Sequence, residues 1–162
     1  MERIRAIRGV DARHHFGLLC RDMAEAATYA RIDDRQFRLM KAATPGSYTF
    51  ILQATREVPR RLLHPRRKTI GVRIPAHRVV QALLTELSEP LLSSTLILAG
   101  DTEPLNDAAT IRARLERRVD LILDSGSCGV VPTTVVDLTE AVPVITRQGK
   151  GAPEVFGELV GA

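Results

Sequence analysis

Short apolar runs of strand type alternate with helical stretches along this chain, and this alternation limits the folds open to it. Strand-like runs lie at residues 16–20, 47–55, 69–74, 91–98, 121–124, 133–138 and 142–147. Stretches with helical periodicity or helix-start signals lie at residues 1–8, 22–30, 33–43, 76–87 and 107–119. Elements of the two kinds alternate first and strands cluster at the end, so the pattern predicts a mixed parallel and antiparallel α/β sheet with flanking helices.

Length and hydropathy point to one domain outside the membrane. A chain of 162 residues with 44% apolar and 26% charged residues is large enough for one hydrophobic core. Apolar runs such as 91–100 are much shorter than the roughly 20 residues that cross a bilayer. The first five residues alternate charged and apolar side chains, unlike a secretory signal. We therefore expect a cytoplasmic protein with no membrane span.

Cysteine and histidine are too sparse to predict a disulfide framework or a metal site. The chain has two cysteines, Cys20 and Cys128, and its histidines are scattered apart from the pair His14 and His15. Closed metal sites need several convergent ligands. We expect free thiols, surface histidines and no bound structural metal.

Positive charge is concentrated in the first half of the chain. Residues 1–81 contain 17 Lys and Arg against 7 acids, whereas residues 82–162 contain 6 against 12. Such asymmetry predicts a positive surface that attracts polyanions, with nucleic acid or a nucleotide phosphate as the partner. Of the 23 cations, 20 are Arg, which suits phosphate but can equally reflect the base composition of a genome.

The densest basic segment lies between residues 56 and 68 and is too rich in proline to form a regular element. Its cations are Arg56, Arg60, Arg61, Arg66, Arg67 and Lys68. A loop of this kind can follow the phosphate backbone of RNA, and the alternative is a merely solvated basic loop. No aromatic residues are interleaved with these cations, which argues against stacking on single-stranded bases and favours double-stranded or structured RNA.

Cations and hydroxyls also stand at the ends of predicted strands. Arg73 closes the 69–74 run, where a side chain would project from a sheet edge as ligand sites in α/β folds require. The hydroxyls of Ser93 to Thr95 can donate to phosphate oxygens or bond to the local backbone. The turn 124–129 can form an anion nest or simply connect two elements, and Cys128 has no neighbouring base that would make it a nucleophile.

Five motifs in sequence order resemble the YrdC/YciO family. They are Pro45-Gly46-x-x-Thr49-Phe50-Ile51-Leu52, Lys68-Thr69-Ile70-Gly71-Val72-Arg73-Ile74-Pro75, Pro90-Leu91-Leu92-Ser93-Ser94-Thr95, Asp124-Ser125-Gly126 with Thr133-Thr134-Val135-Val136-Asp137, and Arg147-Gln148-Gly149. The resemblance is closest to the YciO branch and covers about residues 1–151, leaving a carboxy-terminal tail at 152–162.

This resemblance implies a twisted α/β fold with a positive concave face. Family members of the YrdC branch are threonylcarbamoyl-AMP synthases, which join threonine, bicarbonate and ATP into an adenylate that is used to modify tRNA. By motif position, Arg8 matches a phosphate-binding Lys, Arg73 the Arg of R-x-P, Thr95 the Ser of S-x-N, and Arg147 the Arg of R-x-G.

The ligands that the resemblance implies are ATP with Mg²⁺, and threonine. The full set of expected nucleotide-binding residues, to which no catalytic step is assigned, is Arg8, Arg73, Ser93, Thr95, Thr133, Thr134 and Arg147.

Three departures from the family pattern bear on activity. Val10 stands where the family has the second cation of K-x-R, and Ile97 stands where it has the Asn of S-x-N. The family's opening P-T-[DE]-[ST]-x-Y-x-L-G segment is expected before Met1, and losing its strand would expose a sheet edge that favours a homodimer.

These observations predict a YciO-like protein that binds double-stranded RNA or tRNA and a nucleotide, with weak or absent adenylate synthesis. A working threonylcarbamoyl-AMP synthase is the alternative. A relic without any ligand is the third hypothesis.

Overall fold

The computed structural model describes residues 1–11, 14, 16–64 and 66–159. The chain divides into two compact units that are not contiguous in sequence. We call Met1–His14 with Ser94–Val131 the small unit, and His15–Ser93 with Pro132–Ala162 the sheet unit. No helix within the described ranges combines the length and the apolar character needed to cross a bilayer.

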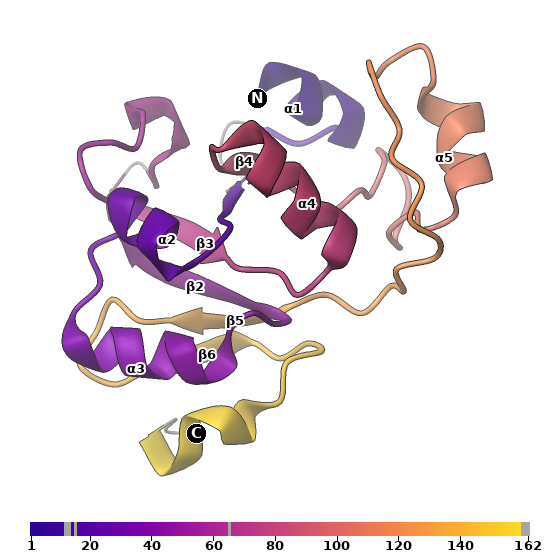
Figure 1. Ribbon diagram of the computed structural model, residues 1–162. Helices are drawn as coiled ribbons and strands as arrows, with labels where there is room; N and C mark the ends of the chain where they lie inside the picture. Colours follow the sequence, from indigo (N-terminus) through magenta and orange to yellow (C-terminus); the bar gives the residue numbers. More distant parts are fainter. Residues whose placement is uncertain (12–13, 15, 65, 160–162) are drawn as a thin grey trace. The chain divides into compact units, whose positions relative to one another are not determined.

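All the strands of the sheet belong to the sheet unit and form one six-stranded sheet (Figure 1). The order is β4 (Leu91–Ser93), β1 (Gly17–Leu19), β3 (Thr69–Arg73), β2 (Tyr48–Gln53), β5 (Thr134–Asp137) and β6 (Val144–Arg147). The β1–β3 and β2–β5 pairs are parallel, and the β1–β4, β2–β3 and β5–β6 pairs are antiparallel. The mixed α/β sheet predicted from the sequence is thus confirmed.

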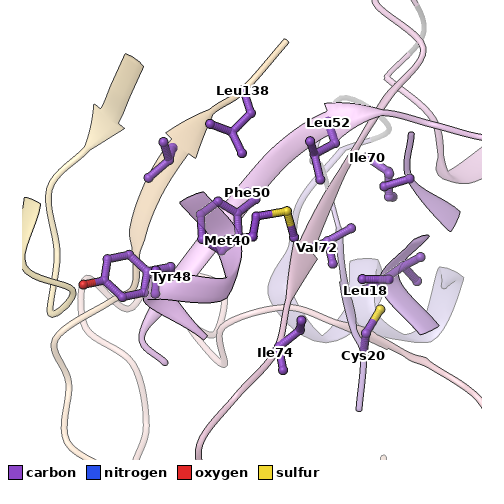
Figure 2. Packing of buried hydrophobic residues seen from close by; sticks show 14 of the residues in the cluster. Leu18, Cys20, Met40, Tyr48, Phe50, Leu52, Ile70, Val72, Ile74 and Leu138 are labelled. Atoms are coloured by element: carbon purple, nitrogen blue, oxygen red, sulfur yellow. The ribbon is translucent and has the colours of Figure 1, made fainter. Parts of the chain in front are cut away.

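The main core lies on one face of this sheet. Tyr48, Phe50 and Leu52 alternate along β2 and are at most 7% exposed, because successive strand residues point to opposite faces. They pack against α2 (Met23–Tyr29) and α3 (Asp34–Ala43) in one hydrophobic cluster, part of which is shown in Figure 2. The intervening β2 residues therefore point to the opposite face of the sheet.

The helices predicted at 22–30 and 33–43 are present, and both begin at side-chain caps. The Asp22 carboxylate accepts the backbone N–H of Glu25 at 2.8 Å at the start of α2. At the start of α3, the Asp33 carboxylate accepts the N–H of Gln36 at 2.7 Å, and the Gln36 side chain accepts the N–H of Asp33 at 2.9 Å. These bonds satisfy backbone donors that have no partner inside the helix, which fixes where each helix starts.

The small unit has its own core of Ile7, Leu98 and Leu115, each at most 8% exposed. Ile7 comes from α1 (Glu2–Arg8) and Leu115 from α5 (Ala108–Leu115). Gly9 ends α1 with φ of 64°, and a Cβ added to it would lie 2.7 Å from the Cβ of Ala99. The predicted helix stop at Gly9 is confirmed, and both its backbone angle and its close contact require glycine.

Two predicted strand segments differ in the structure. Residues 94–98 and 121–124, all of them described, are not in strands, so β4 ends at Ser93. Thr95 O accepts the backbone N–H of Ile97 at 3.0 Å, a tight turn that interrupts a strand ladder. Leu121 is 71% exposed, and an apolar run alone does not make a strand when no neighbouring strand pairs with it.

Two helical details also differ from the sequence expectation. The helix predicted for 76–87 begins two residues later, as α4 (Arg78–Leu87), and Leu84 is the one residue of this helix that is buried, whereas Val79 and Leu87 are 38% and 42% exposed. The basic segment contains a short 3₁₀ turn, η1 (Arg60–Leu62), although its prolines argued against any regular element.

The carboxy-terminal segment contributes to the main core through Phe156 of η2 (Pro153–Leu159). Phe156 is 2% exposed, and its ring makes edge-to-face contacts with Tyr48 and Phe50, with centroids 5.4 and 6.2 Å apart. Such aromatic pairs add to the stabilisation from burial.

Replacing Phe156 with Ala should therefore lower the free energy of unfolding by about 3 to 5 kcal/mol, because a large buried ring is lost. Urea denaturation followed by circular dichroism measures this change. Val155→Ala is the matched control, since Val155 is 39% exposed and its loss should cost less than about 0.5 kcal/mol. Equal effects of the two substitutions would show that η2 does not belong to the core.

Candidate anion-binding sites

Register places two strand-terminal arginines and two threonines at one end of the sheet. Arg73 is the last residue of β3, and Arg147 is the last residue of β6. Thr49 of β2 lies beside Val135 of β5, which in turn lies beside Arg147. Because β2 pairs with β3 in the antiparallel direction through Phe50 and Val72, Thr49 also borders Arg73.

Hydrogen bonds fix Arg147 to the start of β5. Its Nη2 donates to the carbonyl oxygen of Thr133 at 2.9 Å and to the Thr133 hydroxyl at 3.3 Å. The Thr133 hydroxyl also lies 2.8 Å from the hydroxyl of Thr49. The backbone thus orients the guanidinium, and no carboxylate among the described residues pairs with it.

Arg73, at the same end of the sheet, combines a buried nitrogen with a lowered pKa. Its Nε is buried and has no hydrogen-bond partner within the described residues. Burial, followed by the positive charge of Arg147, lowers the pKa of Arg73 below its ordinary value. Among the described residues, neither arginine forms an ion pair with a carboxylate. Two cations close together without an acid are suited to an anion, which would supply both the missing charge and the missing acceptor.

Two cross-strand glycines leave bare backbone on the same face as Arg73. Gly17 of β1 pairs with Gly71 of β3. A Cβ added at Gly17 would meet its nearest atom at 3.6 Å, and one at Gly71 at 3.4 Å, which are ordinary contacts. Neither glycine has a positive φ. Packing therefore does not demand glycine here, and bare strand backbone of this kind is found where a ligand approaches closely.

The hydroxyls of Thr134 and Ser93 are engaged within the sheet unit. The fully buried Thr134 hydroxyl donates to Gly151 O at 2.6 Å and accepts the backbone N–H of Gly149 at 3.0 Å. The Ser93 hydroxyl donates to Gly17 O at 3.2 Å. Both residues hold the backbone around the site, and their donor protons already have partners.

Within the small unit, Arg8 lies in a cluster with His14 and Ser94. Its Nη1 lies 2.9 Å from His14 Nε2 and donates to the Ser94 hydroxyl at 2.7 Å, while its Nε donates to Ile97 O at 3.3 Å. Thr95, which the sequence analysis also selected, is exposed. The small unit thus brings together a guanidinium, an imidazole and a hydroxyl.

The basic loop, which we define as residues 56–68, is anchored to the main core by apolar residues. Val58 is 3% exposed, and Leu62 and Leu63 pack against the same cluster. The six predicted RNA-binding side chains are all exposed, namely Arg56, Arg60, Arg61, Arg66, Arg67 and Lys68. The loop thus presents its cations on a scaffold that the core holds in place.

Polar contacts tie the end of this loop to β5. Arg67 Nη1 donates to Asp137 Oδ2 at 3.3 Å, and the backbone N–H and hydroxyl of Thr139 donate to Asp137 Oδ1 at 2.9 and 2.6 Å. The ring nitrogen Nδ1 of His64 accepts the backbone N–H groups of Arg66 and Arg67 at 3.2 and 3.1 Å. Arg67 is therefore partly neutralised, whereas Arg56, Arg60, Arg61 and Arg66 form no ion pair with a carboxylate among the described residues.

Neither cysteine joins these groups. Cys20 is buried, and this burial, together with Glu25 and Asp22, raises the pKa of its thiol to about 12, which keeps it protonated. Cys128 is exposed. In the described part of the chain, no group of three or more His, Cys, Asp or Glu could hold a metal ion.

Sequence reasoning missed His14 and Thr49 as members of these clusters. His14 contacts Ser94, 80 positions away, and no local pattern reports such a distant partner. Thr49 could have been found, because it alternates with the buried Tyr48 and Phe50 and must face the other side of the sheet.

The sheet, its motifs and its strand-end cations define a known class of protein. The sequence model of the Sua5, YciO and YrdC family, described as telomere recombination, matches residues 1–149. The chain therefore belongs to this family, as its motifs predicted.

Among its relatives, the uncharacterised protein YciO of Escherichia coli K12 is 51% identical over 156 residues, which cover 96% of this chain and 76% of YciO. The crystal structure of E. coli YciO superposes with a TM-score of 0.90 over the same shares. A threonylcarbamoyl-AMP synthase of Pyrococcus abyssi is 34% identical over 128 residues, which cover 75% of this chain and 36% of the synthase. The structure of P. abyssi Sua5 complexed with L-threonine has a TM-score of 0.87 at 26% identity, covering 99% of this chain and 47% of that one.

Replacing Arg73 with Met should raise the free energy of unfolding by about 1 kcal/mol, because it removes a buried charge that lacks an acceptor and faces Arg147. Chemical denaturation without added anions measures this. Arg38→Met on the exposed side of α3 is the control and should change stability by less than about 0.5 kcal/mol. A clear loss of stability in Arg73→Met would mean that Arg73 holds the fold together and is not held for a ligand.

Proposed function

We propose that this chain binds a nucleoside triphosphate at the Arg73–Arg147 end of the sheet and double-stranded RNA or tRNA along the basic loop, with weak or absent adenylate synthesis. The observation that carries the proposal is the pair of unneutralised arginines, one of which has a buried Nε without an acceptor. A bound phosphate would compensate the positive charges of Arg73 and Arg147 and would give the Nε of Arg73 the acceptor that it lacks.

The surroundings of the pair support a nucleotide as the anion. The hydroxyls of Thr49 and Thr133 share one hydrogen bond, which leaves one hydroxyl proton free to donate to a ligand beside Arg147. The bare backbone of Gly17 and Gly71 lies on the same face of the sheet and leaves room for a ligand larger than phosphate alone. Since the described residues include no cluster of metal ligands, Mg²⁺ would arrive on the phosphates of ATP, as it usually does.

The basic loop supports RNA as the second ligand. Arg60 and Arg61 stand on a turn next to Val58, which is buried in the core, so little ordering of these two residues is needed when they meet a phosphate backbone. The segment contains no Phe, Tyr or Trp on which bases could stack. Recognition by charge and shape, as in double-stranded or folded RNA, is therefore favoured over the reading of single-stranded bases.

The alternative function is that of a threonylcarbamoyl-AMP synthase. It is favoured by the 34% identity to the P. abyssi enzyme of that name and by the similarity to a Sua5 structure that contains L-threonine. Against it stand Val10 and Ile97, apolar residues at positions where the family pattern has a cation and an amide. Neither side chain can bind phosphate or metal, so fewer groups remain to stabilise charge as pyrophosphate leaves.

Replacing Arg60 and Arg61 with Gln should weaken the salt dependence of RNA binding. Each lost phosphate contact should reduce the slope of log K against log salt by about 0.9 on a duplex. Fluorescence anisotropy with a labelled RNA duplex at several salt concentrations measures the slope.

The matched control is Arg31→Gln with Arg38→Gln, which removes the same charge from exposed positions outside the loop. An unchanged slope in the Arg60 and Arg61 variant, or an equal change in the control, would exclude the basic loop as the RNA-binding surface.

Thermal denaturation with MgATP, threonine and tRNA separates the candidate functions. A ligand at 100 times its Kd should stabilise the native chain by about 2.7 kcal/mol. We expect stabilisation by MgATP that Arg73→Ala removes, and stabilisation by tRNA that Arg73→Ala leaves largely intact. MgATP binding that strengthens with threonine, together with pyrophosphate release, would favour the synthase, and no shift with any of them would exclude both functions.

A further inference from the structure

Gly17 and Gly71 lie side by side in the middle of the sheet, in the parallel register of β1 and β3. Leu18 and Val72, which follow them in the chain, are at most 5% exposed and point into the main core (Figure 2). Because successive strand residues point to opposite faces, a side chain at either glycine would project from the face opposite the core.

The sheet itself supplies the atoms that surround the two glycines. Apart from neighbours in the chain, a Cβ at Gly17 would meet Gly71 O at 3.6 Å and Ser93 Oγ at 3.9 Å. A Cβ at Gly71 would meet Thr49 Cγ2 at 3.4 Å and Gly17 Cα at 3.8 Å. All these atoms belong to neighbouring strands, so no described helix or loop of the sheet unit covers the pair within 4 Å.

Strand register places this bare pair next to a cation. From β4 to β2, the row across the sheet consists of Ser93, Gly17, Gly71 and Ile51. None of these residues is charged. Arg73 lies two residues beyond Gly71 on the same strand and the same face, at a Cα distance of about 7 Å. A ligand that spans the two rows would therefore meet an uncharged floor at one end and a guanidinium at the other.

The chemistry of the floor favours a flat, uncharged group. Both β1 and β3 have a strand on each side, and the hydrogen-bonding groups of a strand are directed at its neighbours in the sheet. The pair therefore offers a ligand van der Waals contact with bare backbone, which glycine permits because it has no Cβ. Such contact suits the sugar and base of a nucleotide better than it suits a phosphate group, which needs cations or hydrogen-bond donors.

We propose that Gly17 and Gly71 form the floor for the nucleoside part of the nucleotide whose phosphates bind at Arg73 and Arg147. This inference rests on the proposed function, because the phosphates occupy the same site. The missing side chains are then the specificity determinant, since they let the site accept a nucleotide and not only an inorganic polyphosphate. A methyl group at either glycine would occupy volume that the nucleoside fills and would leave both arginines in place.

Isothermal titration calorimetry of the full chain with two magnesium complexes, MgATP and that of methyl triphosphate, tests this proposal. The two ligands carry the same triphosphate monoester, but only ATP has a nucleoside. We expect the wild type to bind MgATP more tightly than methyl triphosphate. Combining Gly17→Ala with Gly71→Ala should raise the Kd for MgATP at least about tenfold, as one misplaced methylene does in a fitted site, and should leave the Kd for methyl triphosphate unchanged.

The melting temperature distinguishes a role in binding from a role in the fold. Neither glycine has a positive φ, so alanine fits the backbone at both positions and restricts the unfolded chain. The double variant should melt at the wild-type temperature or about 1 to 4 °C above it. Glycines that serve only the fold would instead lower the melting temperature when replaced. If the double variant does not fold, the two single variants give the same comparison of ligands.

Val144→Ile is the matched control, because it also adds a methyl group to the sheet, at a residue of β6 that is 44% exposed. It should keep the wild-type affinity for both ligands. An equal loss of MgATP affinity in this control would show that the effect of the glycine variants is not local.

The outcomes separate this inference from the proposed function. Equal binding of the two ligands by the wild type, or equal weakening of both by the glycine variants, would overturn the role of the glycine pair and leave phosphate binding at the arginines in place. If the wild type bound neither ligand, nucleotide binding itself would be overturned, and this inference with it.

Discussion

The central position of β2 governs both the core and the candidate site of the sheet unit. On one face, β2 buries Tyr48, Phe50 and Leu52 against α2 and α3. Its parallel partner β5 and antiparallel partner β3 then bring Thr133 and Arg73 beside Thr49 on the other face. Because side chains alternate strictly along a strand, a slip of one residue in this pairing would exchange the face that is buried in the core with the face that carries Thr49. The packing of Phe50 therefore also determines where the two arginines lie.

The free energy released by this core is large compared with the cost of holding the arginines together. Burial of one large side chain contributes about 1.5 to 3 kcal/mol, and the main cluster contains many such side chains. An unpaired buried polar group costs about 1 to 3 kcal/mol. The fold can thus tolerate the unsatisfied Nε of Arg73 and its repulsion from Arg147. A ligand that supplied an acceptor to this Nε and compensated the two charges would bind more tightly by the free energy that is released.

Sequence predicted the elements whose causes are local and failed where the cause is a distant partner. The helices predicted at 1–8, 22–30 and 33–43 are present, and the residues that start or end them, Asp22, Asp33 and Gly9, act within a few residues of the chain. The segments 94–98 and 121–124 have strand composition, but composition does not supply a neighbouring strand. The same distinction applies to the sites. Arg73 was selected because it lies at the end of a predicted strand, which is a local signal, whereas the contact of His14 with Ser94 joins residues far apart in the chain.

Within the basic loop, the cations are not equivalent, and the difference has a physical origin. Arg67 is held by the carboxylate of Asp137, which is 8% exposed, and Asp137 in turn accepts two hydrogen bonds from Thr139. A cation that is paired in this way attracts a phosphate less strongly, since part of its field is already compensated. Its effect on RNA would be indirect, through the position it gives to the neighbouring backbone, which His64 Nδ1 also holds. Arg60 and Arg61 stand on the 3₁₀ turn that follows the anchoring Val58 and form no ion pair among the described residues, so no carboxylate there compensates their charge.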